Sequence, residues 1–141
     1  MSDKSLPAAF VDTNIWLYAF IESGQIDKSR RAREIIYACQ PIISLQVINE
    51  VCINLIRKAS FTEDQIRQLI TSFYEKYPVI DLDQVILMAA SDLRQRYSFS
   101  FWDSMVIGCA LQTGVGVLYS EDLQHQQMVD GKLLIINPFI E

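Results

Sequence analysis

The 141-residue chain lacks several features that would assign it at once to a class of protein. No apolar run approaches the roughly 20 residues that a membrane-spanning helix requires, so we expect no membrane attachment. The first six residues lack the basic-then-apolar layout of a signal peptide, and a cytoplasmic location is the default expectation. Internal repeats, low-complexity tracts and linkers are also missing. We therefore expect a single domain over residues 1–141.

Cysteine and histidine are scarce, with three cysteines and one histidine in the chain. Cys39, Cys52 and Cys109 are odd in number, widely spaced and set in apolar helical sequence. This pattern fits neither a disulfide framework nor the paired spacing of a zinc site, and we expect three buried, unreactive side chains. His125 lies in a polar run, where a surface position is more common than a catalytic one.

Positive charge is also in short supply, since the net charge is −5, which is unusual for a nucleic-acid-binding protein. No Lys or Arg occurs from Tyr97 to Gly131. The basic residues gather in three other groups, which are Lys28 with Arg30, Arg31 and Arg33, then Arg57 with Lys58, then Arg94 with Arg96. Each group is either a solvated helix face or a contact for phosphates, and the sequence leaves both interpretations open.

Short apolar runs alternate with stretches of helical periodicity along the whole chain. Strands are predicted at residues 8–11, 42–43, 79–80, 115–119 and 133–136, and helices at 15–22, 27–39, 45–58, 63–77, 84–96 and 101–113. Asp27, Ser44 and Asp83 are predicted N-caps, and Thr62 with Gln65 predicts a capping box. The alternation predicts an α/β, three-layer, Rossmann-like fold, with a central parallel sheet of about five short strands flanked by helices.

Acidic residues stand at four places where apolar sequence runs out, namely Asp12, Glu50, Asp103 and Asp122. Asp12 and Asp122 follow predicted strands, whereas Glu50 lies within a predicted helix and Asp103 near the start of another. Ligand sites of open α/β sheets lie beyond the carboxyl ends of the strands, so all four acids can converge there. A carboxylate cluster without cations needs a metal ion to stay ionised. The pattern thus predicts a Mg²⁺ or Mn²⁺ site, which commonly serves phosphodiester hydrolysis.

Each acid also has a simpler interpretation. Asp12 could begin a turn or cap a helix, and Glu50 could face solvent like most mid-helix glutamates. Asp103 has the spacing to complete a capping box with Ser100, a role that is compatible with a site in the crevice above the sheet. Asp122 could be an ordinary acid of a surface loop.

Taken together, these motifs resemble the PIN domain, and specifically the toxin of a VapBC-type toxin–antitoxin pair. The matching motifs are Val11-Asp12-Thr13-Asn14, Asn49-Glu50, Trp102-Asp103-Ser104 and Tyr119-Ser120-Glu121-Asp122, and the likeness runs from Phe10 to Phe139. The resemblance implies a Rossmann-like parallel sheet, a divalent metal, an RNA substrate, and a small cognate antitoxin that covers the acidic site. One departure is Gln126, near which many family members have a glycine.

The resemblance implies that Asp12, Glu50, Asp103 and Asp122 form a catalytic tetrad. In this hypothesis Asp12, Asp103 and Asp122 hold one or two ions, and Glu50 either ligates a metal or orients the water that attacks the RNA phosphodiester in line. Thr13, Asn14 and Ser120 are predicted to support the carboxylates by hydrogen bonding.

Two other functions remain open from the sequence. One is phosphoryl transfer through an aspartyl phosphate at Asp12, although the residue two positions on is Asn14 rather than a second Asp. The other is a metal- or RNA-binding module without significant turnover. A homodimer is also expected, because the bulky residues after Asp12 are either core or a surface for a second copy or an antitoxin. Those bulky residues are Trp16, Leu17, Tyr18 and Phe20.

Overall fold

The structure is a computed structural model that describes residues 6–22 and 24–140. The first residues, on which the signal-peptide expectation depends, lie outside the described part. The strands are β1 (Ala8–Val11), β2 (Gln40–Ser44), β3 (Val79–Ile80), β4 (Val117–Tyr119), β5 (Met128–Val129) and β6 (Leu133–Ile136). The helices are α1 (Thr13–Phe20), α2 (Ile26–Ala38), α3 (Leu45–Ala59), α4 (Glu63–Lys76), α5 (Gln84–Arg96) and α6 (Phe101–Thr113). Within these described ranges, no helix is both long and apolar enough to cross a membrane.

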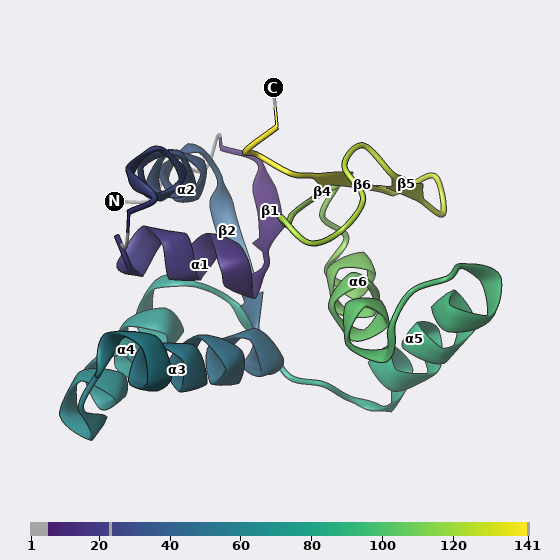
Figure 1. The fold of residues 1–141 in the computed structure, drawn as a ribbon. Coiled ribbons are helices and arrows are strands. Elements are labelled where there is room, and N and C mark those ends of the chain that lie inside the picture. The colour runs from purple at the N-terminus through teal and green to yellow at the C-terminus, as the bar shows by residue number, and fades with distance from the viewer. Residues whose placement is uncertain (1–5, 23, 141) are drawn as a thin grey trace.

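The strands form one mostly parallel sheet in the order β3-β2-β1-β4-β6-β5. Helices α1 to α4 gather on one side of the long central strands and α5 and α6 on the other, as Figure 1 shows. This is the predicted α/β arrangement of a sheet between two helical layers. The strands read as continuous apolar runs because helices cover both faces of a parallel sheet.

The strand order reverses direction between β1 and β4. From β1 the chain steps outward to β2 and then β3, and it then crosses to the opposite side of β1 to form β4. Both neighbours of β1 are parallel to it, and Val11 is aligned with Tyr119 at the carboxyl ends. A crevice opens where strand order reverses in this way, so the topology places a ligand site directly after Val11 and Tyr119.

The core lies where the central strands meet α1, α3 and α6. Phe10, Leu118 and Ile135 are fully buried in three neighbouring strands. Trp16 of α1 is also buried, at 2% exposure, and its ring packs edge-on against Phe73 of α4. Of the bulky residues after Asp12, Trp16 is therefore core, whereas Phe20 keeps 41% of its surface exposed.

The helix ends follow the predicted capping chemistry with one exception. Ser44 and Asp83 cap α3 and α5, and the reciprocal capping box of Thr62 and Gln65 starts α4. The prediction that Asp27 caps α2 is wrong, because the helix begins one residue earlier and Gln25 takes the cap position. Asp27 instead lies in the first turn, where it forms an ion pair with Arg30 three residues later.

The sheet has one strand more than the five predicted. The additional strand, β5, is only two residues long and pairs antiparallel with β6. The strand predicted at residues 115–119 is also shorter, since β4 begins at Val117. Neither difference changes the edge of the sheet at which β1 and β4 end.

Candidate functional site

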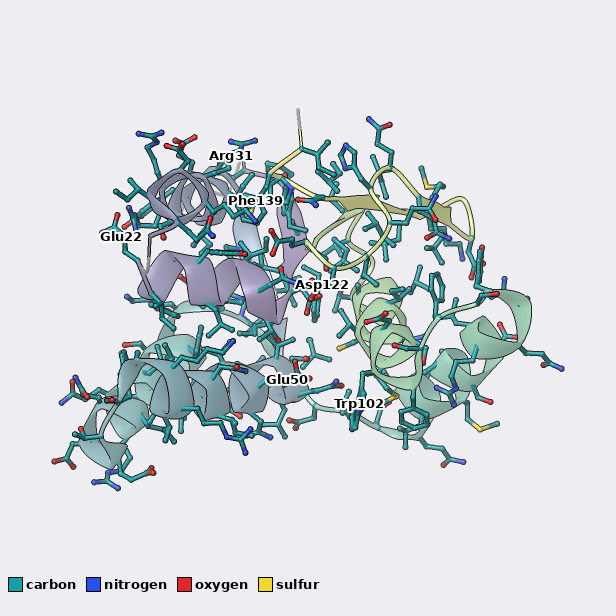
Figure 2. All side chains as sticks on the ribbon, viewed as in Figure 1. Glu22, Arg31, Glu50, Trp102, Asp122 and Phe139 are labelled. Atoms are coloured by element: carbon teal, nitrogen blue, oxygen red, sulfur yellow. The ribbon has the colours of Figure 1, made fainter. Side chains whose placement is uncertain are left out.

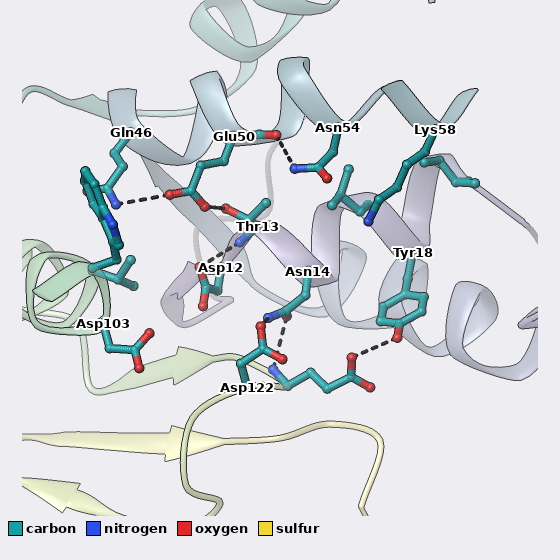
Figure 3. Close-up of a pocket in the computed structure, with 15 residues that line it drawn as sticks. Asp12, Thr13, Asn14, Tyr18, Gln46, Glu50, Asn54, Lys58, Asp103 and Asp122 are labelled. Carbon is teal, nitrogen blue, oxygen red and sulfur yellow. Dashed lines mark hydrogen bonds between the residues drawn. The ribbon is translucent and has the colours of Figure 1, made fainter. Parts of the chain in front are cut away.

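A pocket of about 490 Å³ opens beyond the carboxyl ends of β1 and β4. Its walls are formed by α1, by α3, by the first turn of α6 and by the loop after β4, and all four predicted acids line it. Figure 2 places Glu50 and Asp122 on opposite sides of this opening, and Figure 3 shows the pocket at close range. The structure thus brings together acids that are up to 110 positions apart, Asp12 and Asp122.

Asp12 lies at the base of the pocket, between the end of β1 and the start of α1. Its main-chain N–H donates to the carbonyl of Tyr119 at 3.0 Å, which ties the end of β1 to the end of β4. Its Oδ1 accepts from the N–H of Thr13 at 2.8 Å, and its Oδ2 accepts from the hydroxyl of Ser120 at 2.8 Å. Both oxygens therefore have fixed positions. The helix-capping role and the place in the pocket belong to the same side chain.

Glu50 faces the pocket from α3 rather than pointing to solvent. The hydroxyl of Thr13 donates to its Oε2 at 2.9 Å, and the side-chain amide of Gln46, one turn earlier, donates to its Oε1 at 3.1 Å. Thr13 thus connects two acids, since its N–H binds Asp12 and its hydroxyl binds Glu50. Gln46 was not expected at the site, and its four-residue spacing from Glu50 is the signal that could have indicated it.

Asp122 lies on the exposed loop after β4 and is held by Asn14. The side-chain amide of Asn14 donates to Oδ2 of Asp122 at 3.1 Å, while its Oδ1 accepts from the N–H of Glu121 at 3.1 Å. Asn14 therefore fixes the loop against α1 through both of its polar atoms. Ser120, which binds Asp12, is fully buried at the end of β4.

Asp103 stands in the first turn of α6. The hydroxyl of Ser100 accepts from its N–H at 3.1 Å, so half of the predicted capping box is present. Its carboxylate makes no hydrogen bond or ion pair to another described residue, and it lines the pocket. The capping geometry positions the main chain and leaves this carboxylate available for a ligand.

The pocket carries more negative than positive charge, since five acids and one basic residue, Lys58, are among its described lining residues. Among the described residues, none of the four acids forms an ion pair with Lys, Arg or His, whereas the adjacent Glu121 pairs with Lys28. Burial raises the pKa of Asp12 from 3.8 to about 6, against the hydrogen bonds from Thr13 and Ser120, which lower it. The negative charges of Glu50 and Asp122 raise that pKa further. A cation in the pocket would relieve this unfavourable charge.

The donor set fits a hard divalent cation. Every acid offers carboxylate oxygens, which are the ligands that Mg²⁺ and Mn²⁺ prefer. Within residues 6–22 and 24–140, however, no three acidic, histidine or cysteine side chains already stand close enough to enclose an ion. Mg²⁺ usually keeps several of its waters and takes only one or two carboxylates. Acids spaced around a pocket therefore suit such an ion better than they suit one stripped of water.

The polar lining extends along α3 well beyond the acids. Gln46, Glu50, Asn54 and Lys58 recur every four residues and all line the pocket. In Figure 3 they point from one face of α3 towards α1. The side-chain amide of Asn54 donates to the main-chain carbonyl of Glu50 at 2.8 Å. Asn54 and Lys58 were not singled out from the sequence, although their helical spacing from Glu50 is visible there.

The single histidine and the three cysteines lie outside the pocket lining. His125 accepts a hydrogen bond at Nδ1 from the N–H of Asn137 and does not line the pocket. Cys39, Cys52 and Cys109 are free and buried, as predicted. Burial raises the pKa of Cys39 to about 11 and that of Cys109 to about 12, so both thiols stay protonated at physiological pH.

Comparison with known proteins agrees with this geometry. The PIN domain family model matches residues 9–131. No curated protein sequence gives a significant match.

Solved structures give a consistent fold. A toxin–antitoxin complex from Klebsiella pneumoniae superposes with a TM-score of 0.72 at 21% identity, covering 93% of this chain and 98% of that one. The sarcin–ricin-loop-cleaving toxin VapC20 of Mycobacterium tuberculosis superposes with a TM-score of 0.64 at 16% identity, covering 78% of this chain and 86% of that one. DNA-bound VapBC from Salmonella typhimurium superposes with a TM-score of 0.66 at 16% identity, covering 92% of this chain and 97% of that one. At these identities the likeness establishes the fold.

Proposed function

The chain belongs to the PIN domain family, and we propose that it is a Mg²⁺- or Mn²⁺-dependent endoribonuclease, the toxin of a type II, VapBC-like pair. The observation that carries the proposal is the pocket itself. Asp12, Glu50, Asp103 and Asp122 come from four separate segments, line one opening, and have no cationic partner among the described residues. A protein gains nothing in stability from such an arrangement, so its presence supports a role in binding a cation.

Each side chain has a defined part in the proposed reaction. When bound, a divalent ion lowers the pKa of water and offsets the charge that develops on the phosphate. Asp12, Asp103 and Asp122 would hold the ion. Asp12 is pre-oriented for this by Thr13 and Ser120, and Asp122 by Asn14.

Glu50 has a different environment from the other three acids. Each of its two carboxylate oxygens accepts a hydrogen bond, one from Thr13 and one from Gln46. A carboxylate held in this way can orient the water that attacks the phosphorus in line with the leaving oxygen, or it can act as a further ligand. The water oxygen forms a new bond to phosphorus and releases a proton to solvent, while the bond to the leaving oxygen breaks and that oxygen takes up a proton from solvent.

The geometry favours hydrolysis over the aspartyl-phosphate alternative. Both oxygens of Asp12 accept hydrogen bonds at 2.8 Å, one of them from the main chain, and these contacts orient the lone pair that each oxygen keeps. Asn14, where that alternative would favour a second acid, binds the loop instead. These contacts suit a fixed ligand.

The partners in the proposal come from the structural neighbours. Several of those neighbours are complexes of a toxin with its antitoxin, and VapC20 is described as cleaving the sarcin–ricin loop. We extend both properties to this chain as a proposal, with RNA as the substrate, a small antitoxin as the inhibitor, a homodimer as the assembly and the cytoplasm as the place of action.

The test is cleavage of total cellular RNA by the purified protein in Mg²⁺ or Mn²⁺, with EDTA as the metal-free control. Discrete fragments are expected only with metal, and sequencing their ends identifies the RNA that is cut. Asp103→Asn is expected to slow cleavage by about 10²-fold or more. Asp81→Asn, an exposed acid outside the pocket, removes the same charge and is expected to change nothing. Cleavage that persists in EDTA, or a folded Asp103→Asn variant as fast as the wild type, would refute the proposal.

A further inference from the structure

The pocket is longer than a metal site alone requires. Its polar wall runs along α3 from Gln46 to Lys58, positions that are twelve steps and thus about 18 Å apart along the helix. The acids occupy the half nearest Gln46 and Glu50, and Figure 3 shows Lys58 at the far end of the same face, opposite Tyr18. One nucleotide step of a stacked strand covers about 3.4 Å, so the groove has room for several nucleotides.

Lys58 is the cation at the outer end of this groove. Lys58 lines the pocket, is exposed to solvent, and forms no ion pair with any acid in the described ranges. The other lysine nearby, Lys28, is already committed to Glu121 and to the hydroxyl of Tyr18. Because Lys58 forms no ion pair with any of the five acids that line the pocket, its ammonium group is available for an anion that enters with the substrate.

Trp102 stands at the opposite end, next to Asp103. It lines the pocket, yet 63% of its surface is exposed, which is unusual for the largest apolar side chain. Figure 2 places it at the start of α6, close to the Glu50 end of α3. The preceding residue, Phe101, has a different environment, because the guanidinium of Arg94 lies 4.3 Å from its ring centroid. Among the aromatic and cationic side chains of the described residues, Trp102 contacts only Phe101, with the two rings nearly perpendicular and their centroids 5.6 Å apart.

We propose that this groove holds a single strand of RNA, with one unpaired base stacked on Trp102 and a phosphate bound by Lys58, so that the scissile phosphate lies between them at the acids. The choice of RNA as the ligand rests on the proposed function. A single strand fits better than a duplex, since an aromatic platform needs an open base face and the bases of a duplex already stack on both sides. Trp102 and Lys58 are thus positioning residues for the substrate.

The test is equilibrium binding of a fluorescein-labelled RNA octamer of random sequence, with Ca²⁺ replacing Mg²⁺ and a gel to verify that the RNA stays intact. The same octamer annealed to its complement gives the duplex comparison. Trp102→Ala is expected to weaken single-strand binding about 10-fold or more, because a base stacked on an aromatic ring contributes strongly. Trp102→Phe retains a ring and is expected to bind nearly as well as the wild type.

Lys58 is tested through the salt dependence of the same binding. Each phosphate contact to a single strand contributes about 0.7 to the slope of log affinity against log salt concentration. Lys58→Ala is therefore expected to weaken binding several-fold and to flatten that slope by about 0.7. The matched control is Arg57→Ala, which removes the same charge from the preceding residue of α3, a residue outside the pocket lining. Tyr74→Ala is the control for Trp102, since Tyr74 is 53% exposed on α4 and also lies outside the lining.

Tryptophan fluorescence gives an independent reading. The chain has two tryptophans, and Trp16 is buried at 2% exposure, so a quencher in solvent reports mainly on Trp102. The octamer is expected to quench wild-type emission and to protect it from acrylamide. In Trp102→Phe the remaining Trp16 emission is expected to show neither effect.

Three results would overturn the inference. The first is that the wild-type protein binds the duplex as tightly as the single strand, or does not bind the octamer. The second is that Trp102→Ala and Lys58→Ala bind the octamer as well as their control variants do. The third is that Trp102→Ala changes only the oligomeric state, which would assign Trp102 to an interface between copies. Its failure is distinguishable from that of the proposed function. RNA cleavage without these binding effects refutes the inference alone, whereas these binding effects without metal-dependent cleavage refute the nuclease assignment alone.

Discussion

Replacing Asp12 with asparagine is expected to stabilise the metal-free protein at neutral and alkaline pH. The pKa of Asp12 is about 6 in the folded chain and near 3.8 when unfolded, mainly because burial disfavours the charged form. The folded state therefore holds this proton more tightly. The stabilising contribution of the protonated group is complete below about pH 4 and is lost as the pH rises through about 6.

The size of the effect follows from the same values. A pKa difference of about two units corresponds to about 3 kcal/mol, which is an upper value because Asp12 keeps part of its surface exposed. Asparagine retains the oxygen that accepts from Thr13, and its amide can donate to Ser120, so little hydrogen bonding is lost. We expect a gain of about 1–3 kcal/mol at pH 8, or roughly 3–10 °C in Tm.

The assay is thermal or urea unfolding of wild type and Asp12→Asn in EDTA at pH 4 and pH 8. The variant is expected to be more stable than wild type at pH 8 and equal to it at pH 4. Adding Mn²⁺ at pH 8 is expected to stabilise wild type far more than Asp12→Asn. A variant that is less stable than wild type at pH 8 in EDTA, or a difference that is the same at both pH values, would refute the reasoning.

Three further predictions concern the fold. Cys39 and Cys109 are expected to resist iodoacetamide at pH 8 in the folded protein and to react in urea, because their raised pKa values and burial leave almost no accessible thiolate; mass spectrometry of the folded sample would contradict this by showing modified peptides. Phe73→Ala is expected to cost about 3–5 kcal/mol in urea unfolding, since Phe73 is 2% exposed within the aromatic cluster; a loss below 1 kcal/mol would mean that the cluster is loosely packed. Gln126 has a left-handed backbone with φ of 66°. Gln126→Gly is therefore expected to be neutral or stabilising, and Gln126→Val is expected to be destabilising by about 1–2 kcal/mol. The reverse order of Tm values would show that this loop is not strained.

Much of the fold is predictable from the sequence because local signals and global topology agree. Helix caps depend on residues that are close in sequence. The N-caps Ser44, Thr62 and Asp83 act through their side chains, and Gly114, the C-cap of α6, acts through its left-handed backbone. Strand β5 escaped prediction because two residues carry no periodicity, and its pairing depends on the distant β6. Gln126 adopts the left-handed backbone region that glycine adopts most readily, and nothing in the local sequence signals this conformation.

The candidate site is predictable to a smaller extent. The convergence of the four acids follows from strand ends and helix starts, which topology places at one edge of the sheet. The contacts within the site do not follow, because they depend on how each helix is rotated about its axis. Gln46, Asn54 and Lys58 face the pocket only because α3 turns that side towards α1, and the exposure of Trp102 depends on the packing of α6 against α5.

The most direct test of the central claim is the single-turnover rate of RNA cleavage as a function of Mn²⁺ concentration for four amide variants. These are Asp12→Asn, Glu50→Gln, Asp103→Asn and Asp122→Asn, each compared with wild type and with Asp81→Asn. If the four acids form one metal-dependent site, every pocket variant loses about 10²-fold or more in rate or needs much more Mn²⁺, and Asp81→Asn matches wild type. If the folded pocket variants cleave at the wild-type rate with the wild-type Mn²⁺ requirement, the acidic pocket is not the catalytic site.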